Sequence, residues 1–515
     1  LDAATTVDWN VAIGYNALTA CTGAQNVAVG GAALEDCTTG EYNVAVGMEA
    51  GRNLTTGDQN TMLGRNAMGG ANTITGDHNT CVGSEAGRDI SSGEHNAGVG
   101  RYSLSSTTTG SNNTGCGSNS LPSNTTGASN VAVGTYALNQ NTTADNNTAV
   151  GRSSLAANTT GAENTAVGGY ALDANTTASN NTAVGYNSLT ANTTGSSNNA
   201  FGHQALLTVS TGSSNCAFGN NALKMTTVSD NSAFGKDALK DCSTGSTNSA
   251  FGYTAAHNVT TGGYNVAVGA GALAVNTAGN YNTAVGVYAG DAGSGNNNTC
   301  IGYAAGSAYT GNNITALGVS ALQNCTTGTQ NTAVGDNALI SCTTGQDNTA
   351  LGTNALYSMT GSYSVAVGRY ANMLATGNSN TSVGYNAGYH VTSGTNNSNF
   401  GHGATTSSAT ADNEVTLGDS NVATLRCNDT SISSLSDRRD KTDIVDLPAG
   451  LDFINTLQPR KFKWQTRDGN IKDGRIRAGF IAQELQSAQE DYKYLDLVME
   501  NNPERLEAKQ EHLVP

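Results

Sequence analysis

Near the C-terminus, Ser436 and Lys441 stand five residues apart and have the residue types of a nucleophile and its base. A serine hydroxyl becomes a strong nucleophile when a base removes its proton, and a lysine can be that base when burial or nearby cations lower its pKa. Arg438 and Arg439 supply such cations. Alternatively, Ser434 or Ser436 caps a helix whose first turn carries solvated charges. Spacing alone favours the cap, because serine and lysine five residues apart are common.

Most of the chain before this pair is a repeat. Asn-Thr-Ala-Val-Gly at 164–168 starts again at Asn181, and the closing glycine recurs 25 times from Gly14 to Gly418, in steps of 16 or 17 residues except for one step of 19. A fixed period of this size is typical of solenoids. Each unit offers two extended pieces, x-Ala-Val-Gly and Ala-Leu, separated by Asn-Thr-Thr-Gly turns whose Asn and Gly tolerate left-handed backbone. Coils of parallel strand are favoured over helices.

The core that one chain can build from these units is thin. One Val and one Leu per coil contribute about 3–6 kcal/mol, whereas ordering ~17 residues of backbone costs roughly 17–34 kcal/mol. A column that holds almost only alanine indicates that another surface approaches closely. We interpret this as several chains sharing one core, most simply as a homotrimer. The column includes Ala28, Ala45, Ala149, Ala166, Ala183 and Ala233.

Aromatic residues also recur at fixed positions. Phenylalanine replaces valine before the glycine in four consecutive units, and we expect these rings to stack inside the core rather than form a sugar-binding platform; they are Phe201, Phe218, Phe234 and Phe251. Tyrosines in the turn after the glycine are candidates for glycan contact or ordinary surface; they are Tyr15, Tyr102, Tyr136, Tyr170, Tyr186, Tyr253, Tyr303, Tyr370 and Tyr385. The 19-residue step between Gly64 and Gly83 is expected to bulge outward.

The ten cysteines have no Cys-x-x-Cys spacing, which disfavours zinc. Cys325 and Cys342 should be stacked neighbours, close enough to bridge, although the reduced state is favoured for a protein assembled in the cytoplasm. They belong to a set that falls seven residues after a repeat glycine, namely Cys21, Cys37, Cys242, Cys325 and Cys342. The histidines are scattered among the coils without acidic or cysteine partners. We therefore expect no metal and no cofactor.

The composition changes at Ser436. Residues 436–515 hold 28 charged side chains, whereas the 435 residues before them hold 34, and four of the five prolines lie in this tail. The chain is therefore predicted to be an all-β shaft, a parallel β-roll or β-helix solenoid of about 25 repeats, followed by a junction and a small α+β domain. The three predicted segments are 1–418, 419–435 and 436–515.

Within the tail, apolar spacing and turn residues predict short elements. They are a helix over 449–457 ended by Pro459, a strand over 461–464, a turn over 467–470, a returning strand over 475–481 and a second helix from Ala482.

Residues 10–418, through Asn-x-Ala-Val-Gly-x-x-Ala-Leu, resemble the head repeats of trimeric autotransporter adhesins and, more closely, the shaft repeats of phage tail fibres. This resemblance implies a trimeric, left-handed β-roll or β-helix. The tail resembles the endosialidase-type intramolecular chaperone domain through Ser436-Asp-Arg-Arg-Asp-Lys441-Thr-Asp-Ile, Gly450-Leu-Asp-Phe-Ile, Pro459-Arg-Lys-Phe-Lys-Trp and Gly479-Phe-Ile-Ala-Gln-Glu484.

The second resemblance carries an activity. It implies that the tail trimerises the folding chain and then cuts itself off with a Ser-Lys dyad. Ser436 would attack the carbonyl of Leu435 with Lys441 as general base, severing Leu435-Ser436 once per chain and acting on no external substrate. Members of the family usually continue past Leu513-Val-Pro into a long helix, and the first residue is not a start methionine. We therefore expect the sequence to be a fragment of a longer chain.

We predict a virus tail fibre, located in the virion after assembly in the host cytoplasm. Its expected partners are two further copies of the chain in a homotrimer, a host cell-surface glycan or envelope receptor, and other tail proteins. The net charge of −16 disfavours nucleic acid, and no apolar run reaches the ~20 residues that span a bilayer.

Two alternatives remain. A trimeric bacterial surface adhesin would need a signal peptide and a membrane-anchoring barrel. A glycan-cleaving spike would need paired carboxylates, whereas the acids of the shaft are sparse and scattered.

Overall fold

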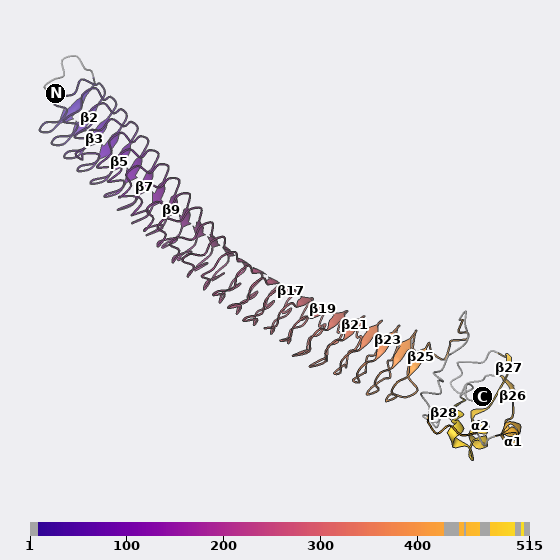
Figure 1. Ribbon diagram of the computed structural model, residues 1–515. Helices are drawn as coiled ribbons and strands as arrows, with labels where there is room; N and C mark the ends of the chain where they lie inside the picture. The colour runs from indigo at the N-terminus through magenta and orange to yellow at the C-terminus, as the bar shows by residue number, and fades with distance from the viewer. Residues whose placement is uncertain (1–8, 427–441, 447–449, 464–473, 500–505, 509–515) are drawn as a thin grey trace. The chain divides into compact units, whose positions relative to one another are not determined.

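The computed structural model describes residues 9–426, 442–446, 450–463, 474–499 and 506–508. The chain divides between Val319 and Ser320 into two compact units. The first unit is a parallel β-solenoid in which every coil contributes one three-residue strand (Figure 1). Its strands are β1 Val11–Ile13, β2 Val27–Val29, β3 Val44–Val46, β4 Thr61–Leu63, β5 Thr80–Val82, β6 Ala97–Val99, β7 Thr114–Cys116, β8 Val131–Val133, β9 Thr148–Val150, β10 Thr165–Val167, β11 Thr182–Val184, β12 Asn199–Phe201, β13 Cys216–Phe218, β14 Ser232–Phe234, β15 Ser249–Phe251, β16 Val266–Val268, β17 Thr283–Val285, β18 Thr299–Ile301 and β19 Thr315–Leu317.

Neighbouring strands pair in register, so that each residue type forms a column. Thr165, Ala166 and Val167 of β10 stand opposite Thr182, Ala183 and Val184 of β11, for example. The predicted parallel solenoid is therefore confirmed.

The alanine column faces the interior of its own coil, which corrects two expectations from the sequence. Side chains alternate across a strand, so the middle residue points opposite to its neighbours. Ala28, Ala166 and Ala183 are fully buried, whereas the flanking Thr and Val are partly exposed. The alanines are small because the interior of the coil is narrow, and they do not mark a surface that another chain approaches. The valine column, expected in the core, lines the outer face.

The phenylalanine ladder forms, but on this outer face. The rings of Phe201, Phe218, Phe234 and Phe251 stack with centroids 4.4, 4.9 and 4.8 Å apart and nearly parallel planes. Three are half-buried, and Phe251 is 42% exposed. Stacking in register was predicted, but the interior position was wrong, because phenylalanine occupies the third strand position.

The Ala-Leu pairs are turns rather than a second extended piece. Leu155 and Leu172 have φ of +49° and +53°, in the left-handed region, and both are fully buried. The left-handed backbone brings each leucine side chain into the interior. The Asn and Gly of Asn-Thr-Thr-Gly tolerate left-handed backbone but do not adopt it here, and neither Asn158 nor Gly161 has a positive φ.

The repeat glycine is required by backbone contact between coils. Gly168 has φ +136°, and a Cβ built there would lie 2.5 Å from the carbonyl oxygen of Gly185 in the next coil. No other residue fits such a position, because the φ is strained for a side chain and the clash is with backbone.

A ladder of buried asparagines supplies the polar part of the interior. The first residue of Asn-x-Ala-Val-Gly is fully buried in most coils, including Asn147 and Asn164. The side-chain oxygen of Asn147 accepts from the backbone N–H (3.0 Å) and the Nδ2 (3.2 Å) of Asn164. Asn164 Nδ2 also donates to the turn carbonyl of Ala178 at 2.9 Å. Repetition therefore satisfies these buried amides from coil to coil.

The long step between Gly64 and Gly83 bulges as predicted. Ala71 and Thr73 are exposed, whereas Ile74 is fully buried and forms a parallel bridge with Leu54. The extra residues leave the coil at its surface, and the register resumes at Ile74.

The second unit begins with further coils and ends in a small α+β region. No described helix is long and apolar enough to cross a membrane. The elements are β20 Thr332–Val334, β21 Thr349–Leu351, β22 Val365–Val367, β23 Thr381–Val383, β24 Ser398–Phe400, β25 Val415–Leu417, α1 Leu451–Thr456, β26 Arg460–Lys463, β27 Ile476–Gly479, α2 Ala482–Ala488, the 3-10 helix η2 Lys493–Leu495, β28 Val498–Met499 and β29 Glu507–Ala508. Both helices and the β26–β27 pair lie where the sequence predicts them; the predicted turn over 467–470 lies outside the described residues.

Candidate functional site

The predicted catalytic residues Ser436 and Lys441, with Leu435 at the cleavage site, lie outside the described residues. The structure describes parts of the tail that come after these residues, from residue 442 onward. The boundaries at 418, 435 and 436 remain predictions.

The structure brings together motifs of the tail that are far apart in the sequence. β26 pairs antiparallel with β27, so that Arg460 stands opposite Gly479. The Nε of Arg460 donates to both carboxylate oxygens of Glu484 at 3.0 and 2.9 Å, and a third contact from its Nη2 measures 2.8 Å. Hydrogen bonding by Arg460 lowers the pKa of Glu484 below its usual value. This ion pair connects the first residue of β26 to α2.

A compact apolar core holds this region. Phe453 of α1, Leu485 of α2, and Leu497 and Val498 near β28 are buried together. The nearly buried Gln489 accepts a 2.6 Å hydrogen bond from the backbone N–H of Leu497. The tail motifs thus form a folded unit whose elements converge on one centre, although 464–473 and 500–505 are not described.

Comparison with known families identifies the tail. Residues 436–494 match the family model described as chaperone of endosialidase, Peptidase S74. The tail is an endosialidase-type chaperone domain. No curated protein matches the chain. A β-solenoid shaft followed by this chaperone domain fits a phage tail fibre with a C-terminal intramolecular chaperone.

Outside the chaperone domain, the coils carry short columns of exposed aromatic rings. In unit 1, Arg152, Tyr170, Tyr186 and His203 form one column. The guanidinium of Arg152 lies 5.6 Å from the Tyr170 ring centroid, Tyr170 contacts Tyr186 edge to face, and Tyr186 stacks on His203 at 5.8 Å. Tyr186 is 51% exposed. This column presents flat apolar faces and polar edges to solvent.

The tyrosines after the repeat glycine were predicted from the sequence as exposed candidates, but the aromatic residues at a second turn of the coil were not. Tyr264 and Tyr281 stack at 4.9 Å, and His78 and His95 stack at 4.8 Å, all just before the ladder asparagine. The 17-residue spacing within each pair was the available signal. The histidines were described as scattered, and these two are in fact neighbours.

Among the described residues, no group of three His, Cys, Asp or Glu side chains is arranged to hold a metal ion. The nine described cysteines are free thiols. Cys81 and Cys300 are buried, and burial raises the pKa of each thiol to about 12, so that neither is a nucleophile at neutral pH.

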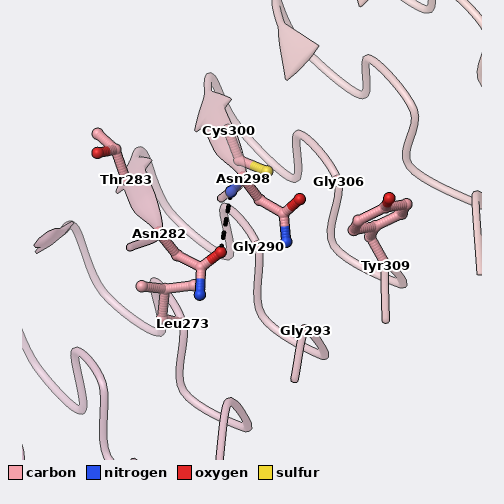
Figure 2. A pocket seen from close by; sticks show the side chains of 9 residues that line it. All are labelled: Leu273, Asn282, Thr283, Gly290, Gly293, Asn298, Cys300, Gly306 and Tyr309. Carbon is pink, nitrogen blue, oxygen red and sulfur yellow. Dashed lines mark hydrogen bonds between the residues drawn. The ribbon is translucent and has the colours of Figure 1, made fainter. Parts of the chain in front are cut away.

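A small hollow in unit 1 is a packing feature rather than an active site (Figure 2). Gly290 and Gly306 stand where most other coils have the inward leucine, so two consecutive coils lack that side chain. Tyr309 is buried in the space, and its hydroxyl donates to the carbonyl of Asn312 at 2.9 Å. The Asn ladder passes beside it, with Asn298 N–H donating to Asn282 Oδ1 at 3.0 Å. Its lining residues are Leu273, Asn282, Thr283, Gly290, Gly293, Asn298, Cys300, Gly306 and Tyr309, none of which is charged.

Proposed function

We propose that the protein is the shaft and host-recognition component of a virus tail fibre, and that its chaperone domain cuts itself off at Leu435-Ser436. The observation that carries this proposal is the family match that begins at Ser436, following a parallel β-solenoid. The fibre is assembled in the host cytoplasm, becomes part of the virion and contacts other tail proteins.

In the proposed cleavage, Lys441 removes the hydroxyl proton of Ser436, and the oxygen attacks the carbonyl carbon of Leu435. The C–N bond breaks as the Ser436 nitrogen takes up the proton, leaving an ester. Water then hydrolyses the ester and releases a carboxylate at Leu435. The reaction consumes one peptide bond and one water per chain, and it leaves a second fragment that begins with Ser436.

Cleavage is tested on the intact chain. Ser436→Ala removes the attacking oxygen and Lys441→Ala removes the base, so both variants should remain full length. Ser434→Ala is the matched control and should be cut like the wild type. N-terminal sequencing should identify Ser436 as the new terminus. An uncut wild type under every folding condition, or normal cutting of Ser436→Ala, would end the proposal.

The proposed homotrimer is supported by the outer face of the sheet. An apolar side chain stands at the third strand position in coil after coil, and many are more than a third exposed, including Val99, Phe251, Val268, Ile301 and Leu317. This column repeats once per coil. A partner must have the same axial spacing to match it over many coils, and another copy of the chain has that spacing. The number three comes from the resemblance to trimeric fibres.

Association through this column predicts that Phe218→Lys yields monomers or aggregates, because the lysine must be desolvated next to apolar neighbours. Thr194→Lys, at an exposed turn, is the control and should remain trimeric. Native mass measurement reads out both variants. A stable folded monomer of the wild type would contradict the homotrimer.

The proposed host contact uses the aromatic column of Tyr170, Tyr186 and His203, because sugar rings present apolar C–H faces that stack on aromatic side chains. Tyr186→Ala should weaken binding of the fibre to immobilised host-envelope glycans, whereas Tyr186→Phe retains the ring and should retain most of the binding. Equal binding by wild type and Tyr186→Ala would place the receptor contact elsewhere.

A further inference from the structure

Two pairs of cysteines stand in consecutive coils at the same interior position. Cys21 and Cys37 are fully buried, and their sulfur atoms lie 3.2 Å apart. Cys325 and Cys342, both in the second unit, are also fully buried and joined by a side-chain hydrogen bond. In a run of consecutive coils of unit 1, from Asn124 to Asn192, this position holds a second asparagine ladder, in which Asn158 Nδ2 donates to Asn141 Oδ1, for example.

The backbones beside the first pair are held at the spacing of neighbouring strands. Thr22 N–H donates to the carbonyl of Thr38 at 2.6 Å, directly after the two cysteines, and Thr22 Oγ1 donates to the same oxygen at 2.8 Å. Strands paired in this way are about 4.8 Å apart, which falls within the Cα separations that disulfides span. The two sulfur atoms, already 3.2 Å apart, therefore need to approach by only about 1.2 Å to reach the length of a disulfide bond.

We propose that Cys21 and Cys37 are a site of oxidative modification, at which a peroxide converts the two stacked thiols into a disulfide that joins neighbouring coils, and that Cys325 and Cys342 form a second such site. Each bond would close a loop of about one coil. Because a cross-link restricts the unfolded chain, both bonds would stabilise the coils after the protein leaves a reducing compartment.

The chemistry of the first pair balances with peroxide as oxidant. The hydrogen bond from Cys37 lowers the pKa of Cys21 to about 7, whereas the pKa of Cys37 is raised by its contact with Cys21 and by burial. Cys21 is thus the thiolate that attacks a peroxide oxygen, giving a sulfenic acid as the O–O bond breaks. The thiol of Cys37 then attacks that sulfur, the S–O bond breaks and water leaves. Two thiols and one peroxide become one disulfide and two waters.

A small oxidant has a short path to this pair. Thr22 and Thr38, the residues that follow the two cysteines, are exposed. The thiols therefore lie one residue beneath a turn at the surface.

The chain offers a matched control in Cys242. It occupies the same interior column and is fully buried, but the residues at this position in the flanking coils are Thr226 and Val259. Burial raises its pKa to about 11. Cys242 therefore has the same burial and the same interior position as the paired cysteines, but it has no cysteine in a neighbouring coil.

The test treats the purified full-length protein with hydrogen peroxide, denatures it in N-ethylmaleimide and cleaves it N-terminal to aspartate. Asp36 lies between Cys21 and Cys37, and Asp336 lies between Cys325 and Cys342. We expect each pair as one linked species, unalkylated and lighter by two hydrogens, that separates on reduction. Cys242 should carry the alkyl group with or without peroxide.

Cys37→Asn introduces the residue that the column holds in other coils, so the variant should fold. The variant should not form the Cys21–Cys37 linked species, and its Cys21 should be alkylated in protein not treated with peroxide. If oxidation raises the thermal midpoint of the wild type, the rise should be smaller in this variant. The proposal is overturned if peroxide oxidises the exposed Cys116 while all four paired cysteines are still recovered as separate alkylated peptides. It is equally overturned if the links join Cys21 or Cys37 to other positions.

Discussion

The coils and the chaperone domain are stabilised in opposite ways. In a coil, most buried side chains stack on the residue at the same position in the coils before and after it, and the interior consists mainly of alanine, leucine and hydrogen-bonded asparagine. In the chaperone domain, Phe453, Leu485, Leu497 and Val498 form one irregular apolar cluster. The stability of the coils therefore depends on backbone geometry and repeated hydrogen bonds, whereas the stability of the chaperone domain depends on the shape of individual side chains.

The repeat glycine gives the largest expected effect. Gly168→Ala places a side chain at φ +136° and within 2.5 Å of a backbone oxygen of the next coil. Strain and overpacking together should cost about 2–6 kcal/mol. Gly169→Ala is the matched control, because its Cβ would meet the ring of Tyr186 at 3.5 Å, an ordinary contact. Chemical denaturation measures both variants; equal midpoints would mean that the coils do not depend on this backbone contact.

The asparagine ladder should give an intermediate effect. Asn164→Ala removes the acceptor of the Asn181 N–H, a bond of 3.0 Å in a fully buried site. Leaving that donor unpaired should cost roughly 1–3 kcal/mol. Asn220→Ala, at an exposed turn position, should leave the free energy of unfolding nearly unchanged. If the two variants have the same free energy of unfolding, the buried amides do not stabilise the stack of coils.

The ion pair of the chaperone domain should give the smallest effect, because Arg460 and Glu484 are both exposed. Their contact lowers the pKa of Glu484 in the folded state. Its contribution should therefore be present above the unfolded pKa of about 4.3 and be lost as the pH falls through the lower folded value. Thermal melts of Glu484→Gln and wild type should differ slightly at pH 7 and converge in acid. A difference that grows in acid would contradict this assignment.

The period of the sequence was enough to predict the solenoid, its register and the stacking of equivalent residues, because a fixed spacing of the repeat glycine constrains every coil alike. Which side chains point inward was mispredicted. Valine is more apolar than alanine, yet alternation in a three-residue strand buries Ala166 and leaves Val167 half-exposed. The burial of Asn164 was not predicted, because a buried amide is stable only with the neighbours that the stack supplies.

For the chaperone domain, the sequence predicted the secondary structure but not the contacts between its elements. Apolar spacing located α1 and α2, and alternation located β26 and β27. The contact between Arg460 and Glu484 could not be predicted, because it depends on how the hairpin packs against a helix 24 residues away. The roles of Ser436 and Lys441 come from the resemblance, since spacing alone favours a helix cap.

The asparagine ladder also gives the stack a direction. From Asn10 to Asn282 each ladder oxygen accepts from the asparagine of the following coil, as Asn26 does from Asn43 and Asn43 from Asn60. The side-chain dipoles therefore align along the axis, and such chains of hydrogen bonds reinforce one another. A stack opened between two coils would expose acceptors on one cut face and donors on the other. Unlike faces complement each other and like faces do not, so the coils can extend one another head to tail but not head to head.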